Sequence, residues 1–219
     1  MIPLNPVNSN LLKSTFLGCV FGAWIGFTVL AWKRKPLQTA ALILPMLIAV
    51  PLILPGDEIN STELRQDYVL RMTSLEGTKY HWGGESSMGI DCSGLPRKAL
   101  RDALLAYGIR HFNGRALRAY LEQWWFDASA RALGEGYRNY TLSIGITGTI
   151  QMIDYQNLVQ GDLAVTTSGV HILAYVGEGR WIQADPGIGV VATLAGRTDD
   201  NEWFRTPVTI HQWQLLAQH

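Results

Sequence analysis

The sequence predicts an α+β domain with an antiparallel sheet, preceded by two membrane-spanning helices. Three observations support this: two long uncharged runs near the N-terminus, helical spacing of apolar residues after them, and short strand-like runs in the last third of the chain. Helices followed by strands are typical of an α+β domain whose helices lie on one side of the sheet. The chain has 18 basic and 18 acidic residues, and this zero net charge argues against a nucleic-acid-binding protein.

The N-terminal part, residues 1–56, is predicted to form a membrane hairpin. Two apolar runs without any charged residue are separated by the basic triplet at 33–35. A helix needs roughly 20 apolar residues to cross a bilayer, so we expect spans at about 14–32 and 37–54. A cleavable signal peptide is the alternative for the first run, but no clear cleavage site follows it.

The basic triplet also predicts the orientation of the hairpin. Short basic links stay on the cytoplasmic side of a membrane, so both termini are expected to face outward. Pro45, Pro51 and Pro55 predict that the second run is kinked or partly unwound. Cys19 is expected to be a small buried residue inside the first span.

From residue 57 onward the composition is that of one domain. Apolar spacing and flanking residues predict a helix over 61–77, with Ser61 as a possible N-cap and Gly77 as a stop. A second helix is expected over 95–108 and a third region of helix over 114–136.

Beyond the helices, the pattern changes to short runs rich in Val, Ile and aromatic residues, punctuated by Gly, Pro or Asp. Such runs predict strands of an antiparallel meander. The expected strands lie at 161–167, 170–177, 180–186, 189–196 and 206–216.

The stretch "YHWGGESSMGIDCSGLPRKAL" at 80–100 places Cys92 where a turn-rich loop meets a helix. A thiol becomes a nucleophile as the thiolate, which is favoured at a helix N-terminus and beside a histidine. His171 begins a predicted strand, and Gln183 in the next strand is the candidate third group that holds the imidazole. A hairpin turning at 177–179 would place His171 opposite Gln183, whereas a one-residue slip would separate them.

The blocks "YHWGG", "DCSGL", "GDLAV", "VHILAYVGEG" and "WIQA" occur in an order that resembles the NlpC-type cell-wall cysteine peptidases. This papain-like family cleaves stem peptides of bacterial peptidoglycan, and the resemblance covers about residues 62–215. It implies a papain-like NlpC-type fold and hydrolysis of a stem-peptide amide, most typically the bond between D-γ-glutamate and a diamino acid. Taken with the predicted hairpin and its orientation, this leads us to expect a bacterial inner-membrane protein whose catalytic domain lies on the periplasmic, outer face.

The resemblance assigns roles in the reaction to four residues. Cys92 corresponds to the nucleophile, His171 to the general base and Gln183 to the residue that orients the imidazole. Tyr80 matches the family tyrosine near the nucleophile, where its hydroxyl would help the Cys92 N–H to stabilise the oxyanion.

Three further residues are expected to bind substrate. Asp91 and Ser93 match positions that hold the free amine of the stem peptide in related enzymes. Trp82 is the third residue that we expect to contact the substrate.

The sequence departs from the family pattern at three places. Gln183 stands where histidine is most frequent; it keeps an acceptor for the ring N–H but cannot titrate, and we expect activity to be retained. Pro96 favours a helix start slightly later than Leu95. The stretch at about 108–155 is longer than a minimal connection, and we interpret it as a helical insertion whose "EQWWFD" segment could wall the substrate groove.

Two other classes of function remain open. The dyad does not define the acyl group, so a papain-like amidase or acyltransferase acting on another substrate is possible. A non-catalytic module of an envelope or secretion assembly, with protein partners bound through the hairpin, is the other class. The presence of both Cys92 and His171 favours an enzyme. With a single cysteine in the domain, no metal cluster and no cofactor are predicted.

Overall fold

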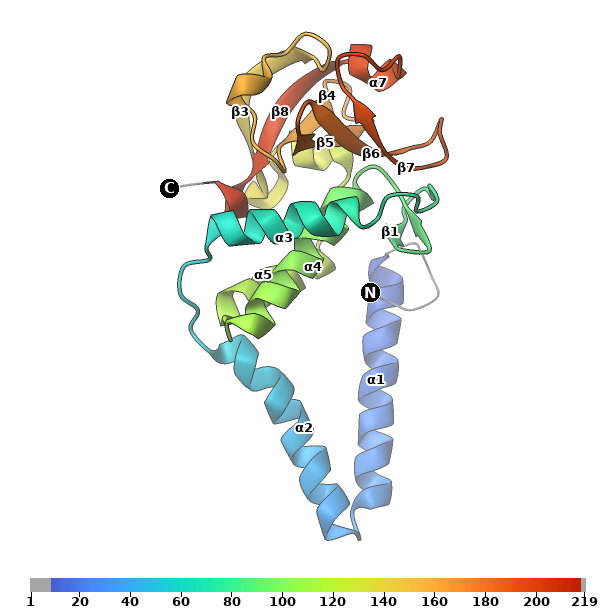
Figure 1. The fold of residues 1–219 in the computed structure, drawn as a ribbon. Helices are drawn as coiled ribbons and strands as arrows, with labels where there is room; N and C mark the ends of the chain where they lie inside the picture. Colours follow the sequence, from blue (N-terminus) through green and yellow to red (C-terminus); the bar gives the residue numbers. More distant parts are fainter. Residues whose placement is uncertain (1–8, 218–219) are drawn as a thin grey trace.

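The computed structural model describes residues 9–217 and contains a helical hairpin attached to an α+β domain (Figure 1). The hairpin consists of α1 (Asn10–Ala31) and α2 (Lys35–Ile53). The helices of the domain are α3 (Ser61–Thr73), α4 (Gly94–Arg110), α5 (Gly114–Trp125), α6 (Ala130–Gly134) and α7 (Glu202–Arg205). Its strands are β1 (Glu85–Ser86), β2 (Gly89–Ile90), β3 (Thr141–Thr149), β4 (Leu163–Thr166), β5 (Ile172–Gly177), β6 (Arg180–Asp185), β7 (Val190–Ala195) and β8 (Pro207–Trp213). Three short 3-10 turns complete it: η1 (Tyr137–Asn139), η2 (Tyr155–Asn157) and η3 (Gln214–Leu216).

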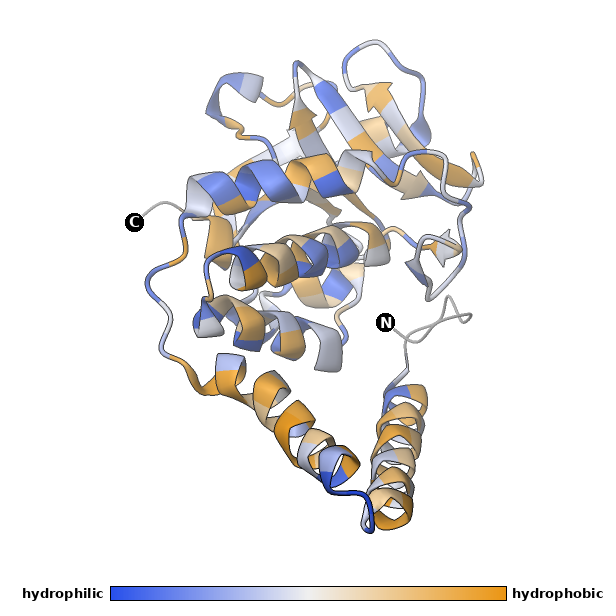
Figure 2. Cartoon of the chain, turned by 60° about the horizontal axis from the view of Figure 1, so that its bottom comes forward, coloured by the Kyte–Doolittle hydropathy of each residue, from blue (hydrophilic) through white to orange (hydrophobic). Residues whose placement is uncertain are grey.

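The two hairpin helices diverge from the basic turn towards the domain (Figure 1). Apolar residues cover both of them, and the hydrophilic turn lies at the end away from the domain (Figure 2). Each is long and apolar enough to cross a bilayer by length and composition. The second run was predicted to be kinked or partly unwound; α2 runs through Pro45 and Pro51 as one helix, so it is not unwound there. Cys19 is exposed on α1 rather than buried by other parts of the protein.

The first two domain helices have ends that differ from the predicted ones. Asn60, rather than Ser61, caps α3, because its Oδ1 accepts from the N–H groups of Thr62 and Glu63. Helix α3 ends four residues before Gly77. Helix α4 starts before Pro96 and continues past Gly108. The proline lies in the first helical turn, where N–H groups lack acceptors within the helix, so it costs little there.

The predicted helical insertion at 108–155 is wrong in part. It contains α5, α6 and the turn η1, but residues 141–149 form the nine-residue strand β3. This strand pairs antiparallel with β8 at one edge of the sheet.

The sheet has six strands in the order β3-β8-β4-β5-β6-β7, and all neighbouring strands are antiparallel. Strands β4 to β7 form the predicted meander, and β8 returns to pair between β3 and β4. The α+β class with an antiparallel sheet is therefore confirmed.

Alternating residues of β5 separate two hydrophobic cores. Ile172 and Ala174 pack towards the helices, in a core that includes Leu100 of α4. Leu173 and Tyr175 face the other side, where the segment at 150–158 and α7 cover the sheet. Helices α3 to α6 thus lie on one face of the sheet, as predicted, whereas the short α7 lies on the other.

Polar contacts attach the hairpin to the domain at two points. Lys13 Nζ, near the start of α1, donates to the backbone oxygen of Trp125 at 3.1 Å. Arg118 Nη1 of α5 donates to the backbone oxygens of Leu52 at 2.6 Å and Leu54 at 3.0 Å. Both ends of the hairpin therefore meet helix α5.

Candidate active site

A cavity of about 650 Å³ opens where the start of α4, the small β1–β2 sheet, the α5–α6 connection and the start of β5 meet. Six of the seven predicted site residues line it: Tyr80, Trp82, Asp91, Cys92, Ser93 and His171. The seventh, Gln183, is completely buried and hydrogen-bonded to His171. Residues that are far apart in the sequence are thus assembled around one cavity.

The carboxylate of Asp91 fixes the backbone that carries Cys92. Its Oδ1 accepts from the N–H of Gly94 at 2.6 Å and from the Ser93 hydroxyl at 3.0 Å, while Oδ2 accepts from the N–H of Gly83 at 2.9 Å. Asp91 therefore caps the first N–H of α4 and ties the helix to the preceding loop. A Cβ at Gly94 would collide with the backbone oxygen of Gly84, so this position has room only for glycine.

Cys92 is 7% exposed as a residue, and its thiol lies against the backbone just before β5, with Sγ 3.9 Å from the oxygen of Val170. Burial raises the pKa of the thiol to about 12, and the charge of Asp91 adds to the rise. Backbone N–H groups, foremost that of Ile172, act in the opposite direction. The resting sulfur is therefore protonated, and a base must remove its proton.

His171 is held by an amide whose orientation is itself determined. Its Nε2 lies 2.7 Å from Gln183 Oε1. Gln183 Nε2 donates to the carboxylate of Asp185 at 3.3 Å, so the amide must present its oxygen to the ring. Nε2 then carries the proton, and Nδ1 is left with its lone pair as the basic nitrogen.

Burial also keeps the imidazole neutral. It lowers the pKa of His171 to about 4, although the hydrogen bond to Gln183 and the charge of Asp185 oppose the shift. The ring is 1% exposed and stacks on the indole of Trp203, with ring centroids 4.1 Å apart. A neutral, oriented imidazole is the form that accepts a proton.

The strand register differs from the predicted one. Ala174 pairs with Ile182 and Tyr175 with Trp181. Continuing this register puts Gln183 opposite Leu173, two residues from His171. A two-residue shift keeps side chains on the same face of the sheet, so the pair still meets along a diagonal.

Tyr80 and Trp82 border the cavity from the loop before β1. Burial, followed by the charges of Cys92 and Asp91, raises the pKa of Tyr80 to about 12. Its hydroxyl is therefore a hydrogen-bond donor over the working range of most enzymes. Trp82 is 78% exposed at the rim, where its indole can be reached by a ligand.

Three residues of the site were not predicted. Asp185 lies two positions after Gln183, so strand alternation could have indicated that the two share a face. Trp203 comes from α7, and nothing in its local sequence points to a stack on His171. Arg97, 2% exposed, lines the cavity from the first turns of α4. The sequence around Arg97 is that of an ordinary surface helix. Arg97 becomes buried only because another segment packs over it, and the helix pattern does not predict this.

The α5–α6 connection borders the cavity. Of the EQWWFD segment at 122–127, only Asp127 lines it, followed by Ser129, Ala130 and Arg131.

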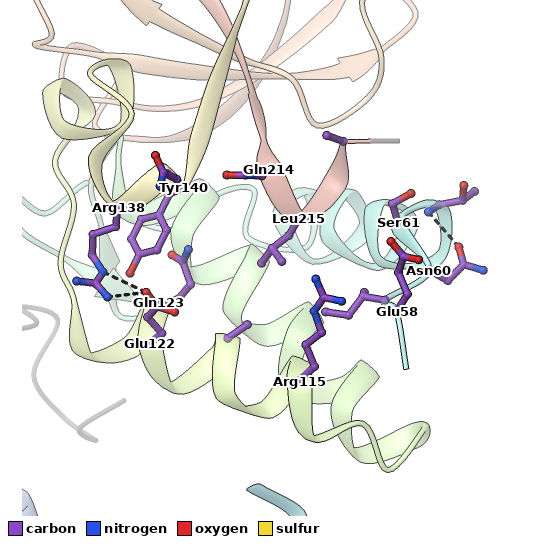
Figure 3. Close-up of a pocket in the computed structure, with 15 residues that line it drawn as sticks. Glu58, Asn60, Ser61, Arg115, Glu122, Gln123, Arg138, Tyr140, Gln214 and Leu215 are labelled. Atoms are coloured by element: carbon purple, nitrogen blue, oxygen red, sulfur yellow. Dashed lines mark hydrogen bonds and ion pairs between the residues drawn. The ribbon is translucent and has the colours of Figure 1, made fainter. Parts of the chain in front are cut away.

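A second cavity of about 760 Å³ lies between α5, the loop before α3 and the C-terminal turn η3 (Figure 3). The described residues lining it include the ion pair of Glu122 and Arg138 but neither a cysteine nor a histidine. Within residues 9–217, no group of three or more His, Cys, Asp or Glu side chains is arranged to hold a metal ion. The candidate nucleophile and base belong only to the first cavity.

Several solved structures resemble the chain at low sequence identity. NlpC1 and NlpC2 from Trichomonas vaginalis are 19% and 18% identical, with TM-scores of 0.45 and 0.46. They cover 68% and 71% of this chain, which spans only 44% and 49% of theirs. The peptidoglycan hydrolase RipB from Mycobacterium tuberculosis is 21% identical, with a TM-score of 0.40, and the alignment covers 68% of this chain and 65% of RipB. No curated protein sequence matches the chain.

The sequence itself matches a family model over residues 77–202, which is more than half of the chain. The matched region runs from the loop before Tyr80 to the start of α7 and contains Cys92, His171 and Gln183. The chain therefore belongs to the NlpC/P60 family.

Proposed function

We propose that this protein is a membrane-anchored cysteine peptidase that hydrolyses an amide bond in peptidoglycan stem peptides. Membership of the NlpC/P60 family supports the class of enzyme, since the family consists of cell-wall cysteine peptidases. The observation that carries the specific proposal is the buried hydrogen bond between His171 and Gln183, on a histidine that shares one cavity with Cys92.

In the proposed reaction, His171 Nδ1 takes the proton of the Cys92 thiol as the sulfur attacks the scissile carbonyl carbon. The imidazolium that forms is stabilised by Gln183 Oε1 and by the charge of Asp185. Collapse of the tetrahedral adduct breaks the C–N bond, and the leaving amine takes the proton from His171. A water molecule then gives a proton to the same nitrogen and attacks the thioester, which releases the acid and returns the proton to Cys92.

The oxyanion of the tetrahedral adduct would be held by two donors, the backbone N–H of Cys92 and the hydroxyl of Tyr80. Both lie beside the thiol, and the raised pKa of Tyr80 keeps its hydroxyl protonated. Donors that are fixed before the reaction stabilise developing charge without reorganisation.

The proposed bond is that between D-γ-glutamate and a diamino acid. Its N-terminal side presents a free amine, for which Asp91 and Ser93 are the proposed binding groups. Asp91 already accepts three hydrogen bonds, and a carboxylate has room for a fourth. Trp82 is proposed to contact the peptide at the rim.

The proposed location is the bacterial inner membrane, with the domain on the periplasmic side. The two apolar helices and the basic turn between them support this placement. A compartment-sensitive reporter at the C-terminus tests it, because a reporter active only in the cytoplasm should stay silent.

The substrate is tested with the full chain in detergent, incubated with purified stem peptides and, separately, with intact peptidoglycan. Mass spectrometry should detect release of an L-Ala-D-Glu dipeptide from the free stem peptides. Release of intact stems from peptidoglycan would identify an amidase instead.

The chain offers a matched pair of cysteine variants for the mechanism. Cys92→Ala should abolish release, whereas Cys19→Ala on α1 should leave it unchanged. Equal products from the Cys92→Ala protein would rule out the proposed nucleophile.

A further inference from the structure

The membrane hairpin contacts the segment next to the candidate active site through one lysine. Lys13, near the start of α1, is buried, and the start of α1 lies beside β1 (Figure 1). Its Nζ donates to the oxygen of Trp125 at 3.1 Å and to Asn10 Oδ1 at 3.3 Å, and it lies 5.6 Å from the centre of the Trp124 ring. A lysine at the start of a membrane helix would ordinarily extend to water or lipid head groups. Here it inserts into the domain.

The segment held by Lys13 in turn holds a residue of the cavity wall. Two positions after Trp125, the carboxylate of Asp127 pairs with Arg97 Nη1, and the same nitrogen donates to the oxygen of Ala128 at 3.3 Å. Arg97 and Asp127 both line the cavity that contains Cys92. Contacts therefore run without a gap from α1 to the site.

These residues form one charged cluster, which we call the cationic wall: Lys13, Glu85, Arg97, Arg101 and Asp127. Glu85 binds Arg97 at 2.7 Å and Arg101 at 2.6 Å, and the field of the other four residues acts on Lys13. Within these five residues three positive charges meet two negative ones, while Asp91, beside Cys92, carries a separate negative charge on which Arg97 acts. Glu85, Arg97 and Arg101 are buried, and charges away from water are weakly screened.

We propose that Lys13 is a positioning residue that holds the cationic wall beside Cys92, so that the site favours a substrate carrying a carboxylate near the scissile bond. The proposal rests on the proposed function, in which a glutamate linked through its γ-carboxyl keeps a free α-carboxylate. The membrane helix is then a working part of the site rather than only an anchor.

The wall's charge is measured by the alkylation of Cys92, which needs no peptidase activity. The probes are iodoacetate, which carries a carboxylate, and iodoacetamide, which is neutral. The two rates are measured with the full chain in nanodiscs, and their ratio is compared between variants. Because both probes react with the same thiol, the ratio does not depend on the reactivity of that thiol and reports the charge around it. All variants carry Cys19→Ala, so that only Cys92 reacts.

Lys13→Met should lower the ratio of iodoacetate to iodoacetamide rates about three- to tenfold, as expected for losing one charge at a poorly screened site. Lys13→Arg should keep most of the ratio, and Lys33→Met, at the far end of the hairpin, should not change it. A merely structural lysine would not move this ratio, so an unchanged value in Lys13→Met overturns the proposal. If Lys13→Met does not fold, Lys13→Gln makes the same comparison.

Stem peptides with a free or an amidated α-carboxylate give the second readout. The wild-type protein should have the lower KM for the free acid, and Lys13→Met should lose that preference while kcat changes less. If the wild-type protein cleaves neither peptide, the proposed function fails, while the alkylation ratio still decides the role of Lys13. Equal KM values for the two peptides in the wild-type protein would overturn the proposed selectivity.

Discussion

At the scale of single residues, the burial of His171 determines the pH range of the proposed reaction. The base acts in its neutral form, which is present above its pKa of about 4. The acid limb of kcat/KM should therefore fall near pH 4 instead of near 6.5, the ordinary value for histidine. Activity should be lost only as the pH drops through that limb, and a kcat/KM profile measured from pH 3 to 8 checks this.

Trp203→Leu tests whether the burial of His171 is the cause of its low pKa. It removes the ring that stacks on His171, so water reaches the imidazole and the acid limb should move towards 6.5. A wild-type limb already near 6.5 would show that the imidazole is solvated and that burial does not control its pKa.

Gln183 is expected to matter through the orientation of the imidazole. Gln183→Ala removes the acceptor of the Nε2 proton, so kcat should fall on the order of 10²-fold, the effect of a misplaced catalytic group. Gln183→His, which restores an acceptor, should retain most of the activity. Steady-state kinetics of both variants measure the two losses of kcat. Equal losses would mean that the volume of the Gln183 side chain matters and its hydrogen bond to His171 does not.

At the scale of elements, the junction between the loop and α4 depends on a missing side chain. Gly94→Ala would force the start of α4 away from the oxygen of Gly84 and displace Cys92 without removing any chemical group. We expect kcat/KM to fall by more than tenfold, again through misplacement. Gly22→Ala on α1, where a Cβ meets no neighbouring atom, is the control and should have no effect.

The cap of α4 separates two roles of Asp91. Asp91→Ala removes the acceptor of the Gly94 N–H and should lower the free energy of unfolding by about 1–2 kcal/mol. Asp91→Asn keeps an oxygen for the Gly94 N–H but loses the charge and the acceptor of the Gly83 N–H, so stability should fall less than in Asp91→Ala, while KM for a peptide with a free amine rises. Chemical denaturation and steady-state kinetics measure the two effects, and an unchanged KM would assign Asp91 to the cap alone.

The sequence predicted the meander and the α4 helix because local pattern and packing agree there. Strand β3 was not predicted, although Leu142, Ile144 and Ile146 alternate along it. The strand interrupts its own pattern at Gly145 and Gly148, where φ is positive, and a register shift separates its two halves. An edge strand with one partner needs less regularity, so its signal in the sequence is weak.

The sequence predicted those site residues that belong to recognisable sequence motifs. Cys92, His171 and Gln183 were identified from ordered blocks, and six of the seven predicted residues share one cavity. Arg97 and Trp203 reach the cavity, and Lys13 reaches the segment beside it, through packing between segments that are distant in the chain. The periodicity of the sequence does not report such packing. The register was predicted two residues off, and the side-chain pair survived because both registers place it on one face.

At the scale of the whole molecule, the domain is predicted to move with the hairpin. Arg118→Ala removes both hydrogen bonds to the end of α2 and should let the domain turn more freely. Anisotropy decay of a dye on Met152→Cys, an exposed site, in a protein that also carries Cys19→Ala and Cys92→Ala, should become faster in nanodiscs. Arg115→Ala is the control, because within the described residues no hairpin oxygen accepts from Arg115. Equal decays in the two variants would show that Arg118 does not restrain the domain.

The hydrogen bonds between Arg118 and the end of α2 also limit how far from the membrane the proposed enzyme can reach. A domain on a long flexible linker can reach a volume that grows with the length of the linker. Here, by contrast, α5 is hydrogen-bonded directly to the last turn of the apolar helix α2. If α2 spans the inner membrane as proposed, the cavity stays at a nearly constant height above the bilayer. Stem peptides in the layer next to the membrane would then be cut, and those in more distant layers would be left intact.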